Sequence, residues 1–211
     1  MPHRDKLMKK NLFIHLLPIL FFAEVCYSYV EIDTKAPDFT LSNSFGEEIS
    51  LSEFSGKKII IEWTNHGCPF VAKHYKTGNM QSTQQFSEEI DAVWLSIISS
   101  APGTQGYVTP LEANELTMKR SASPSHVLLD SGGAVGKMYE AKTTPHMYII
   151  DEEGILKYQG AIDDAGGRGF MFKDLLKAKN YIKNGLIELN NGDDISSPIT
   201  KPYGCSVKYA S

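Results

Sequence analysis

The sequence has few cysteines and no excess of positive charge. Its 211 residues include only three cysteines, Cys26, Cys68 and Cys205, and 21 basic against 25 acidic side chains. So few cysteines exclude a small scaffold held together by several disulfides. The net charge of −4 argues against nucleic acid as a partner, because binding phosphates requires clustered lysine and arginine. With 42% hydrophobic residues the chain can fold around a core, and its length fits one α/β domain.

Only one long hydrophobic run is present, and it lies near the N-terminus. Residues 12–23 are apolar apart from His15 and Pro18. Basic side chains precede the run at Arg4, Lys6, Lys9 and Lys10. The run is shorter than the roughly 20 residues of a membrane span and is typical of a signal peptide. We therefore predict a signal peptide over residues 1–28, export to the periplasm or the medium, and no stable membrane insertion after cleavage.

Two other interpretations of this leader remain open. One is an N-terminal anchor that is never cleaved. The other is a lipoprotein modified at Cys26, which Glu24 and Val25 disfavour because lipidation sites prefer small residues there. Cleavage after Ser28 would leave Cys68 and Cys205 as the two cysteines of the mature chain, in an oxidising compartment.

The remainder of the chain alternates strand and helix patterns. Alternating or continuous apolar runs predict strands, and apolar residues at helical spacing predict helices. The predicted strands span residues 36–41, 48–51, 58–63, 92–98, 126–129, 146–151 and 155–160, and the predicted helices span 69–75, 80–90, 110–121, 133–141 and 173–189. We expect one α/β domain over residues 29–189, opening with a β-hairpin. Residues 190–211 show no regular period and form a tail that carries Cys205.

Cys68 is the strongest candidate for chemistry. It stands between the buried strand 58–63 and a helix that begins at Pro69, a residue suited to the first helical turn. Free N–H groups and the helix dipole at this position favour a thiolate, which is the nucleophilic form of cysteine. Trp63, five residues earlier, is expected to shield the sulfur. The alternative is that Cys68 is simply a small buried hydrophobic residue.

Residues near Cys68 and a second motif add weaker candidates. Thr144-Pro145 precedes a hydrophobic strand, where a cis peptide bond is reasonable. His66 and His146 are expected either to stabilise the thiolate or move protons, or to be ordinary loop histidines. Asn65 is interpreted either as a substrate-orienting residue or as a cap of its loop.

Glu62 lies within the strand that leads to Cys68. Its carboxyl group could accept a proton if it points toward the site. Strand alternation could equally turn it outward.

Five motifs together resemble a known family. They are residues 36–41 (APDFTL), 65–71 (NHGCPFV), 142–146 (KTTPH), 160–164 (GAIDD) and 202–209 (PYGCSVKY). The chain resembles thioredoxin-like proteins of the redoxin branch, which contains alkyl hydroperoxide reductase and thiol-specific antioxidant proteins, and especially its exported peroxiredoxin-like members. The resemblance implies a thioredoxin-like fold, with a central mixed β-sheet flanked by helices and an N-terminal β-hairpin extension. It also implies that Cys68 is the redox nucleophile and that Pro145 is a cis-proline facing it.

Two positions depart from the patterns of such proteins. Val71 stands where the second cysteine of a C-x-x-C motif would be, so a neighbouring disulfide cannot form. Ile61 and Asn65 replace the proline and threonine of the peroxiredoxin pattern Pro-x-x-x-Thr-x-x-Cys, so the hydroxyl that binds peroxide is missing. Cys205 is the candidate replacement for the second thiol. It would resolve a Cys68 sulfenic acid as a disulfide, or else form a static bridge or stay free.

The resulting hypothesis is an exported thiol-dependent oxidoreductase with an antioxidant role. It would reduce a peroxide or exchange protein disulfides through Cys68, with an external dithiol as reductant and without a cofactor. A metal site is not expected, because copper chaperones of this fold use a second thiol close to the first. The main alternative is a thioredoxin-like binding or assembly module, including a metal-chaperone-like one, that has lost catalysis.

Overall fold

The computed structural model describes residues 30–166 and 175–210. Its strands are β1 (Thr40–Asn43), β2 (Glu48–Ser50), β3 (Ile59–Trp63), β4 (Val93–Ile98), β5 (His126–Leu129), β6 (Thr143–Thr144), β7 (His146–Ile150), β8 (Leu156–Gly160) and β9 (Cys205–Ser206). Its α-helices are α1 (Pro69–Lys76), α2 (Asn79–Glu89), α3 (Pro110–Lys119), α4 (Ala134–Met138) and α5 (Tyr181–Asn190), and two short 3-10 helices are η1 (Leu51–Phe54) and η2 (Leu175–Lys177).

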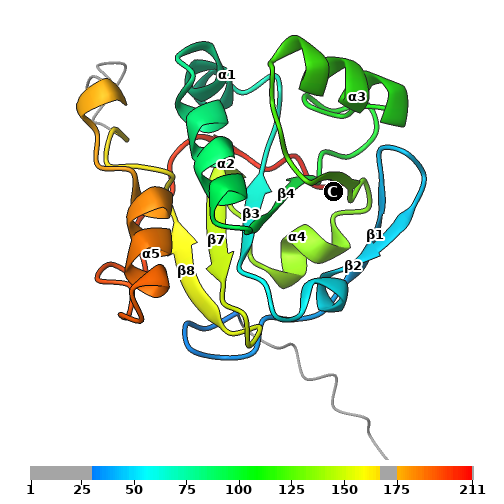
Figure 1. Cartoon of the computed structure of the whole chain (residues 1–211). Helices are drawn as coiled ribbons and strands as arrows, with labels where there is room; N and C mark the ends of the chain where they lie inside the picture. Colours follow the sequence, from blue (N-terminus) through cyan, green and yellow to red (C-terminus); the bar gives the residue numbers. More distant parts are fainter. Residues whose placement is uncertain (1–29, 167–174, 211) are drawn as a thin grey trace, which may run out of the picture.

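Seven strands form one mixed sheet in the order β2-β1-β5-β4-β3-β7-β8 (Figure 1). The central strands β3, β4 and β5 run parallel, while β7 runs antiparallel to β3. Helices α1, α2 and α5 pack on one face, and α4 packs with η1 on the other. The predicted α/β, thioredoxin-like fold is therefore confirmed.

Burial on both faces explains the apolar sequence of β3. Ile59, Ile61 and Trp63 point into the core on the α4 side, and Ile60 points into the core under α1 and α2. A strand covered on both sides needs a continuous apolar run rather than alternation. Glu62 is the polar exception in this run, and its complete burial excludes the outward one of the two orientations considered above.

The sheet topology brings two distant motifs to the same edge. Strand β3 ends at Trp63, and β7 begins opposite it, with Trp63 paired to His146. The loop that leads from β3 to α1 therefore lies next to the residues that precede β7. This places Cys68 beside Pro145 although 77 residues separate them in the chain.

The closing helix is shorter than the period predicts. Of the predicted helix 173–189, residues 173 and 174 lie outside the described residues, and α5 begins only at Tyr181. Asn180 is the cap, because its side chain accepts a hydrogen bond from the N–H of Lys183. The Tyr181 N–H bonds the carbonyl of Ile162 instead of a helical partner. Tertiary contacts with this segment therefore set the helix start.

The C-terminal tail is more ordered than predicted. It runs along the end of the sheet, from the β8 side toward α4 (Figure 1). Within it, β9 pairs antiparallel with β6, and Cys205 lies opposite Thr144. The expectation of a tail without regular structure is therefore wrong at this point, because a two-residue strand is too short to show a period in the sequence.

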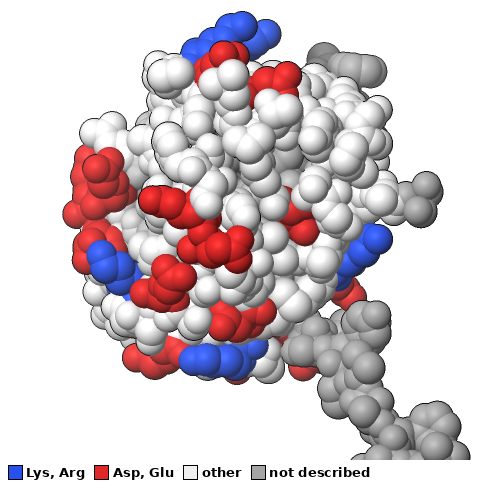
Figure 2. All heavy atoms as spheres, turned by 90° about the vertical axis from the view of Figure 1, so that its right-hand side faces the viewer, with Lys and Arg blue, Asp and Glu red and all other residues white. Residues whose placement is uncertain are grey.

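The surface carries scattered charge. Figure 2 shows carboxylates spread over the face on the α3 and β1 side, with basic side chains mainly at its margins. In the part of the chain that the structure describes, no helix is long and apolar enough to cross a membrane. The predicted signal peptide, residues 1–28, lies outside the described residues.

Candidate active site

Cys68 is completely buried at the start of α1. It is the N-cap residue of the helix, and Pro69 occupies the first turn as predicted. Its thiol donates a hydrogen bond to the carbonyl oxygen of Thr144 over 3.0 Å, and its sulfur accepts one from the N–H of Cys205 over 3.4 Å. Backbone groups from two other segments therefore hold the sulfur in place.

Hydrogen bonds outweigh burial at Cys68. Burial alone would raise the pKa of the thiol. The N–H of Val71, the thiol and N–H of Cys205 and the side chain of Thr144 bond the sulfur in ways that favour the thiolate. Their combined effect lowers the pKa of Cys68 below its ordinary value. The sulfur is thus prepared as a nucleophile.

The pKa of the Cys205 thiol is shifted in the opposite direction. Burial, the hydrogen bond that its thiol donates to Cys68 and the negative charge of the Cys68 thiolate raise its pKa to about 11. Both cysteines are free thiols in this structure, and the N–H of Cys205 lies 3.4 Å from the Cys68 sulfur. Cys68 is therefore the more acidic thiol of the pair, and Cys205 keeps its proton to higher pH.

The peptide bond between Thr144 and Pro145 is cis, as the sequence predicts. This bend presents the Thr144 carbonyl to Cys68 and the edge of β6 to the tail. Gly204 makes the close approach possible, because a Cβ atom there would lie 2.0 Å from the Thr144 oxygen. Its φ of +143° also lies in a region that other residues rarely adopt.

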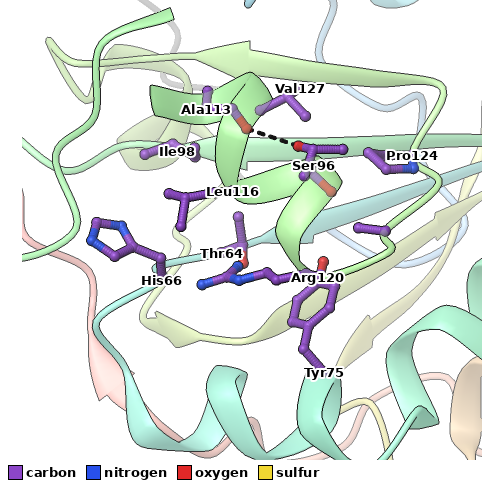
Figure 3. Close-up of a pocket in the computed structure, with 12 residues that line it drawn as sticks. Thr64, His66, Tyr75, Ser96, Ile98, Ala113, Leu116, Arg120, Pro124 and Val127 are labelled. Atoms are coloured by element: carbon purple, nitrogen blue, oxygen red, sulfur yellow. Dashed lines mark hydrogen bonds between the residues drawn. The ribbon is translucent and has the colours of Figure 1, made fainter. Parts of the chain in front are cut away.

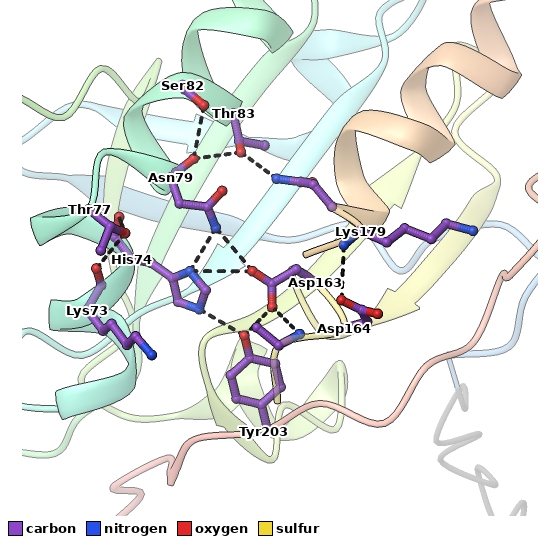
Figure 4. Close-up of polar contacts among 12 residues, drawn as sticks. Lys73, His74, Thr77, Asn79, Ser82, Thr83, Asp163, Asp164, Lys179 and Tyr203 are labelled. Atoms are coloured by element: carbon purple, nitrogen blue, oxygen red, sulfur yellow. Dashed lines mark hydrogen bonds and ion pairs between the residues drawn. The ribbon is translucent and has the colours of Figure 1, made fainter. Parts of the chain in front are cut away.

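A buried polar network holds the tail just before Cys205 (Figure 4). The Tyr203 hydroxyl donates to Asp163 over 2.5 Å, and His74 Nε2 lies 3.0 Å from the same hydroxyl. Asn79 donates to His74 Nδ1 and to the second oxygen of Asp163. His74 and Asp163 are both about 1% exposed, so the network anchors the tail within the core.

The donors and acceptors of this network define the protonation state of His74. Its Nδ1 accepts from Asn79, and the Tyr203 hydroxyl directs its hydrogen to Asp163. Nε2 must therefore carry the proton that is donated to the Tyr203 oxygen. This is a neutral imidazole, which agrees with the lowering of the His74 pKa by burial and Lys73, against the opposing effect of Asp163.

Contacts after Cys205 fasten the tail on its other side. The carbonyl of Lys208 accepts from the N–H of Ala101, and the Tyr209 hydroxyl donates to the carbonyl of Ala141. The tail is thus fixed before and after Cys205, which explains why Cys68 is inaccessible to solvent.

Several predicted site residues have structural positions instead. Trp63 packs with Tyr139 and Tyr148 on the α4 side of the sheet, whereas Cys68 belongs to the core on the other side, so Trp63 is not its shield. Asn65 caps its loop: its Oδ1 accepts from the N–H of Gly67, and its Nδ2 donates to the carbonyl of Gln105.

The two histidines lie apart from the sulfur. His146 is buried and bonds the Tyr148 hydroxyl and the N–H of Lys142. Burial and the charge of Lys142 lower its pKa to about 3, so it is neutral. His66 lines a hollow between α1 and α3, and burial and Arg120 lower its pKa. Within the described residues, no hydrogen bond joins either histidine to Cys68.

Sequence reasoning missed the tail network. Tyr203, His74 and Asp163 come from three separate segments, and no local spacing links them. The one available signal was that Tyr203 lies in the same motif as Cys205. Among the described residues, no group of three or more His, Cys, Asp or Glu side chains could hold a metal ion.

Several solved structures share the fold of this chain. A protein of Sinorhizobium meliloti 1021 designated SMc02350 is similar with a TM-score of 0.72 and 20% identity, over 87% of this chain and 97% of that one. An uncharacterized conserved protein from Geobacillus kaustophilus is similar with a TM-score of 0.75 and 21% identity, over 86% and 93%. A candidate thiol:disulfide interchange protein DsbE from Chlorobium tepidum gives 0.50 and 20%, over 62% and 84%. These likenesses establish the thioredoxin-like fold.

The family follows from the sequence match. Residues 32–159, more than half of the chain, match the model of the AhpC/TSA family, and the chain belongs to that family. It is in general terms a thiol oxidoreductase of the redoxin type. No curated protein matches the sequence.

Substitution of Gly204 should uncover Cys68. In Gly204→Ala the new Cβ collides with the Thr144 oxygen, so the tail must shift. We expect iodoacetamide to alkylate Cys68 about tenfold faster in the reduced protein, which corresponds to about 1.4 kcal/mol in the opening equilibrium. Mass spectrometry of the Cys68 peptide measures the rate. Gly46→Ala is the matched control, because Gly46 also has positive φ but faces open space. Equal rates in both variants would contradict a tail held by this contact.

Removal of the Tyr203 hydroxyl should loosen the same tail. Tyr203→Phe leaves Asp163 and His74 each without one buried partner, and we expect the free energy of unfolding to fall by about 1–3 kcal/mol. Alkylation of Cys68 should also become several-fold faster. Tyr181→Phe, at a tyrosine whose ring stacks on Tyr158, serves as the control. A loss of stability without faster alkylation would show that the network does not restrain the tail.

Acid should destabilise the protein through His146. Its pKa is about 3 in the folded chain and about 6.5 when unfolded, so the unfolded chain binds more protons between these values. The free energy of unfolding then falls as pH drops from about 6.5 toward 3, by up to about 5 kcal/mol. Urea denaturation at several pH values measures this loss, which should shrink in His146→Gln and persist in His126→Gln. If both variants show the same pH dependence, His146 is not the cause of the loss of stability in acid.

Proposed function

We propose that this protein is a two-cysteine thiol-disulfide oxidoreductase in which Cys68 is the redox nucleophile and Cys205 the resolving thiol. The observation that carries the proposal is the hydrogen bond of 3.4 Å from the Cys205 N–H to the Cys68 sulfur, which places the two cysteines side by side. The pKa of Cys68 is lowered and that of Cys205 raised, which suits a nucleophile and its resolving partner. A pair in contact replaces the C-x-x-C motif, whose second position is Val71.

Disulfide exchange needs two balanced steps. The Cys68 thiolate attacks one sulfur of a substrate disulfide, forms a mixed disulfide and releases the first substrate thiolate. Cys205, after losing its proton, attacks the Cys68 sulfur and releases the second substrate thiol. The substrate gains two electrons, and the enzyme is left with a Cys68–Cys205 disulfide. An external dithiol then returns the enzyme to the reduced state.

Peroxide reduction is the second candidate, with the antioxidant role that it implies. Here the thiolate takes one peroxide oxygen and becomes a sulfenic acid, an alcohol or water leaves, and Cys205 condenses with the sulfenic acid to give the same disulfide and water. One observation favours disulfide exchange over it. Ile61 is packed in the core and Asn65 caps its loop, so neither offers the hydroxyl that peroxiredoxins use.

The proposal includes export. It rests on the predicted signal peptide over residues 1–28, with periplasmic or secreted protein as the product, and the DsbE name of the Chlorobium tepidum relative agrees with a thiol:disulfide role. Suitable partners are a protein disulfide or a small peroxide as substrate and a dithiol as reductant.

Thiol mapping tests the mechanism. The reduced wild-type protein is treated with a small disulfide or with hydrogen peroxide, and the products are mapped by mass spectrometry. We expect an intramolecular Cys68–Cys205 disulfide in the wild type, a trapped mixed disulfide or sulfenic acid on Cys68 in Cys205→Ser, and no oxidation in Cys68→Ser. If Cys68 reacts with neither oxidant, even in Gly204→Ala, the protein is instead a binding or assembly module without catalysis.

A further inference from the structure

A hollow of about 490 Å³ lies between α1 and α3, next to the loop that carries Cys68. His66, Ala72, Tyr75, Leu116 and three basic residues line it. The volume is in the range of binding sites for small molecules. His66 precedes Cys68 by two residues, so their Cα atoms are at most about 7 Å apart. The hollow therefore borders the redox site proposed above.

The three basic residues make the hollow positive. They are Lys76 at the end of α1, Lys119 at the end of α3, and Arg120, which follows. Among the described residues, none of them has a carboxylate within ion-pair distance. One ordinary role for such residues is to balance helix C-termini. Each helix end, however, is equivalent to only about half a negative charge, so two ends cannot balance three full positive charges.

Arg120 is held in a fixed orientation. Its guanidinium lies 4.8 Å from the centre of the Tyr75 ring, and its side chain extends toward Thr64 and His66 (Figure 3). Contact with an aromatic ring leaves the N–H donors of an arginine at its edge, where they match a carboxylate in a two-bond arrangement. The other walls, Ala72 and Leu116, are apolar.

The floor of the hollow carries a buried hydroxyl. A smaller cavity of about 30 Å³ shares His66, Tyr75, Leu116 and Arg120 with it. Thr64 lines this cavity and is 7% exposed, and its hydroxyl lies beside the Glu62 carboxylate, whose pKa it helps to lower. The hydroxyl has no other partner within the described part of the chain, so its remaining hydrogen-bonding capacity is open to a polar group or water in the cavity.

The other side of Cys68 is already occupied. The edge of β6, where an extended polypeptide could pair, is taken by β9, with Thr144 opposite Cys205. With that edge closed, the hollow is the concave surface beside the Cys68 loop, and its cationic walls fit a small molecule better than a protein strand.

We infer that this hollow binds the carboxylate of a small, acidic disulfide and so directs its sulfur to Cys68. The inference rests on the proposed function and names its substrate class. Lys76 lies eight residues after Cys68, about 12 Å along the helix axis. The substrate thus needs roughly 10 Å between sulfur and carboxylate, a length that a tripeptide-sized thiol supplies. Its reduction follows the two-step exchange given above, with two thiols released.

Matched disulfides test the inference. The probes are oxidised glutathione, its fully esterified form and the small neutral bis(2-hydroxyethyl) disulfide, and the readout is the second-order rate of Cys68 oxidation by mass spectrometry. We expect oxidised glutathione to react about tenfold faster than its ester at low ionic strength, and this preference to shrink in 0.5 M salt. The comparison uses the wild-type protein, so it does not depend on the folding of a variant.

Charge variants locate the effect. Lys76→Gln combined with Lys119→Gln changes two exposed side chains and should lower the rate with oxidised glutathione three- to tenfold, while the rate with the neutral bis(2-hydroxyethyl) disulfide stays unchanged. Lys57→Gln, at an exposed lysine paired with Asp91, is the control and should change neither. Equal rates for glutathione and ester, or an unchanged rate in the double variant, overturn the inference. Failure of all three probes to oxidise Cys68 would instead count against the proposed function.

Discussion

The contact between the Cys68 sulfur and the backbone of the C-terminal tail is the constraint on which the site depends. The sulfur lies between the Thr144 carbonyl and the N–H of Cys205, and both groups are fixed by the pairing of β6 with β9. The tail that favours the thiolate is also the tail that buries it. Reactivity and access are therefore opposed, and a catalytic cycle requires the tail to move while its contacts before and after Cys205 remain intact.

Oxidation changes the electrostatics of the pair in a useful direction. The negative charge of Cys68 is one cause of the high pKa of Cys205. Once Cys68 carries a mixed disulfide or a sulfenic acid, that charge is gone, and so is the acceptor for the Cys205 thiol. Cys205 can then lose its proton more easily. In the cycle that we propose, the Cys205 thiolate thus becomes available at the stage when a resolving nucleophile is needed, and is suppressed when Cys68 itself must attack.

Local sequence could predict the parts of the fold and site that local patterns determine. The strand and helix order, the Pro69 helix start and the cis bond before Pro145 each leave a signal within a few residues. The face on which Trp63 packs and the inward direction of Glu62 depend on which helices cover the sheet. The His74, Asp163 and Tyr203 network joins three distant segments, so it leaves no spacing to recognise. The two-residue strand β9 is likewise defined only by its partner.

Tyr75 connects the buried acid of the core with the cationic hollow. Its hydroxyl donates to the Glu62 carboxylate, which Trp94 and Ser96 also bond, and its ring carries Arg120. Burial raises the pKa of Glu62, although hydrogen bonds from its neighbours oppose this. Glu62, the polar residue within the apolar strand β3, therefore contributes to the hollow indirectly. It fixes the position of Tyr75, and the Tyr75 ring in turn holds Arg120.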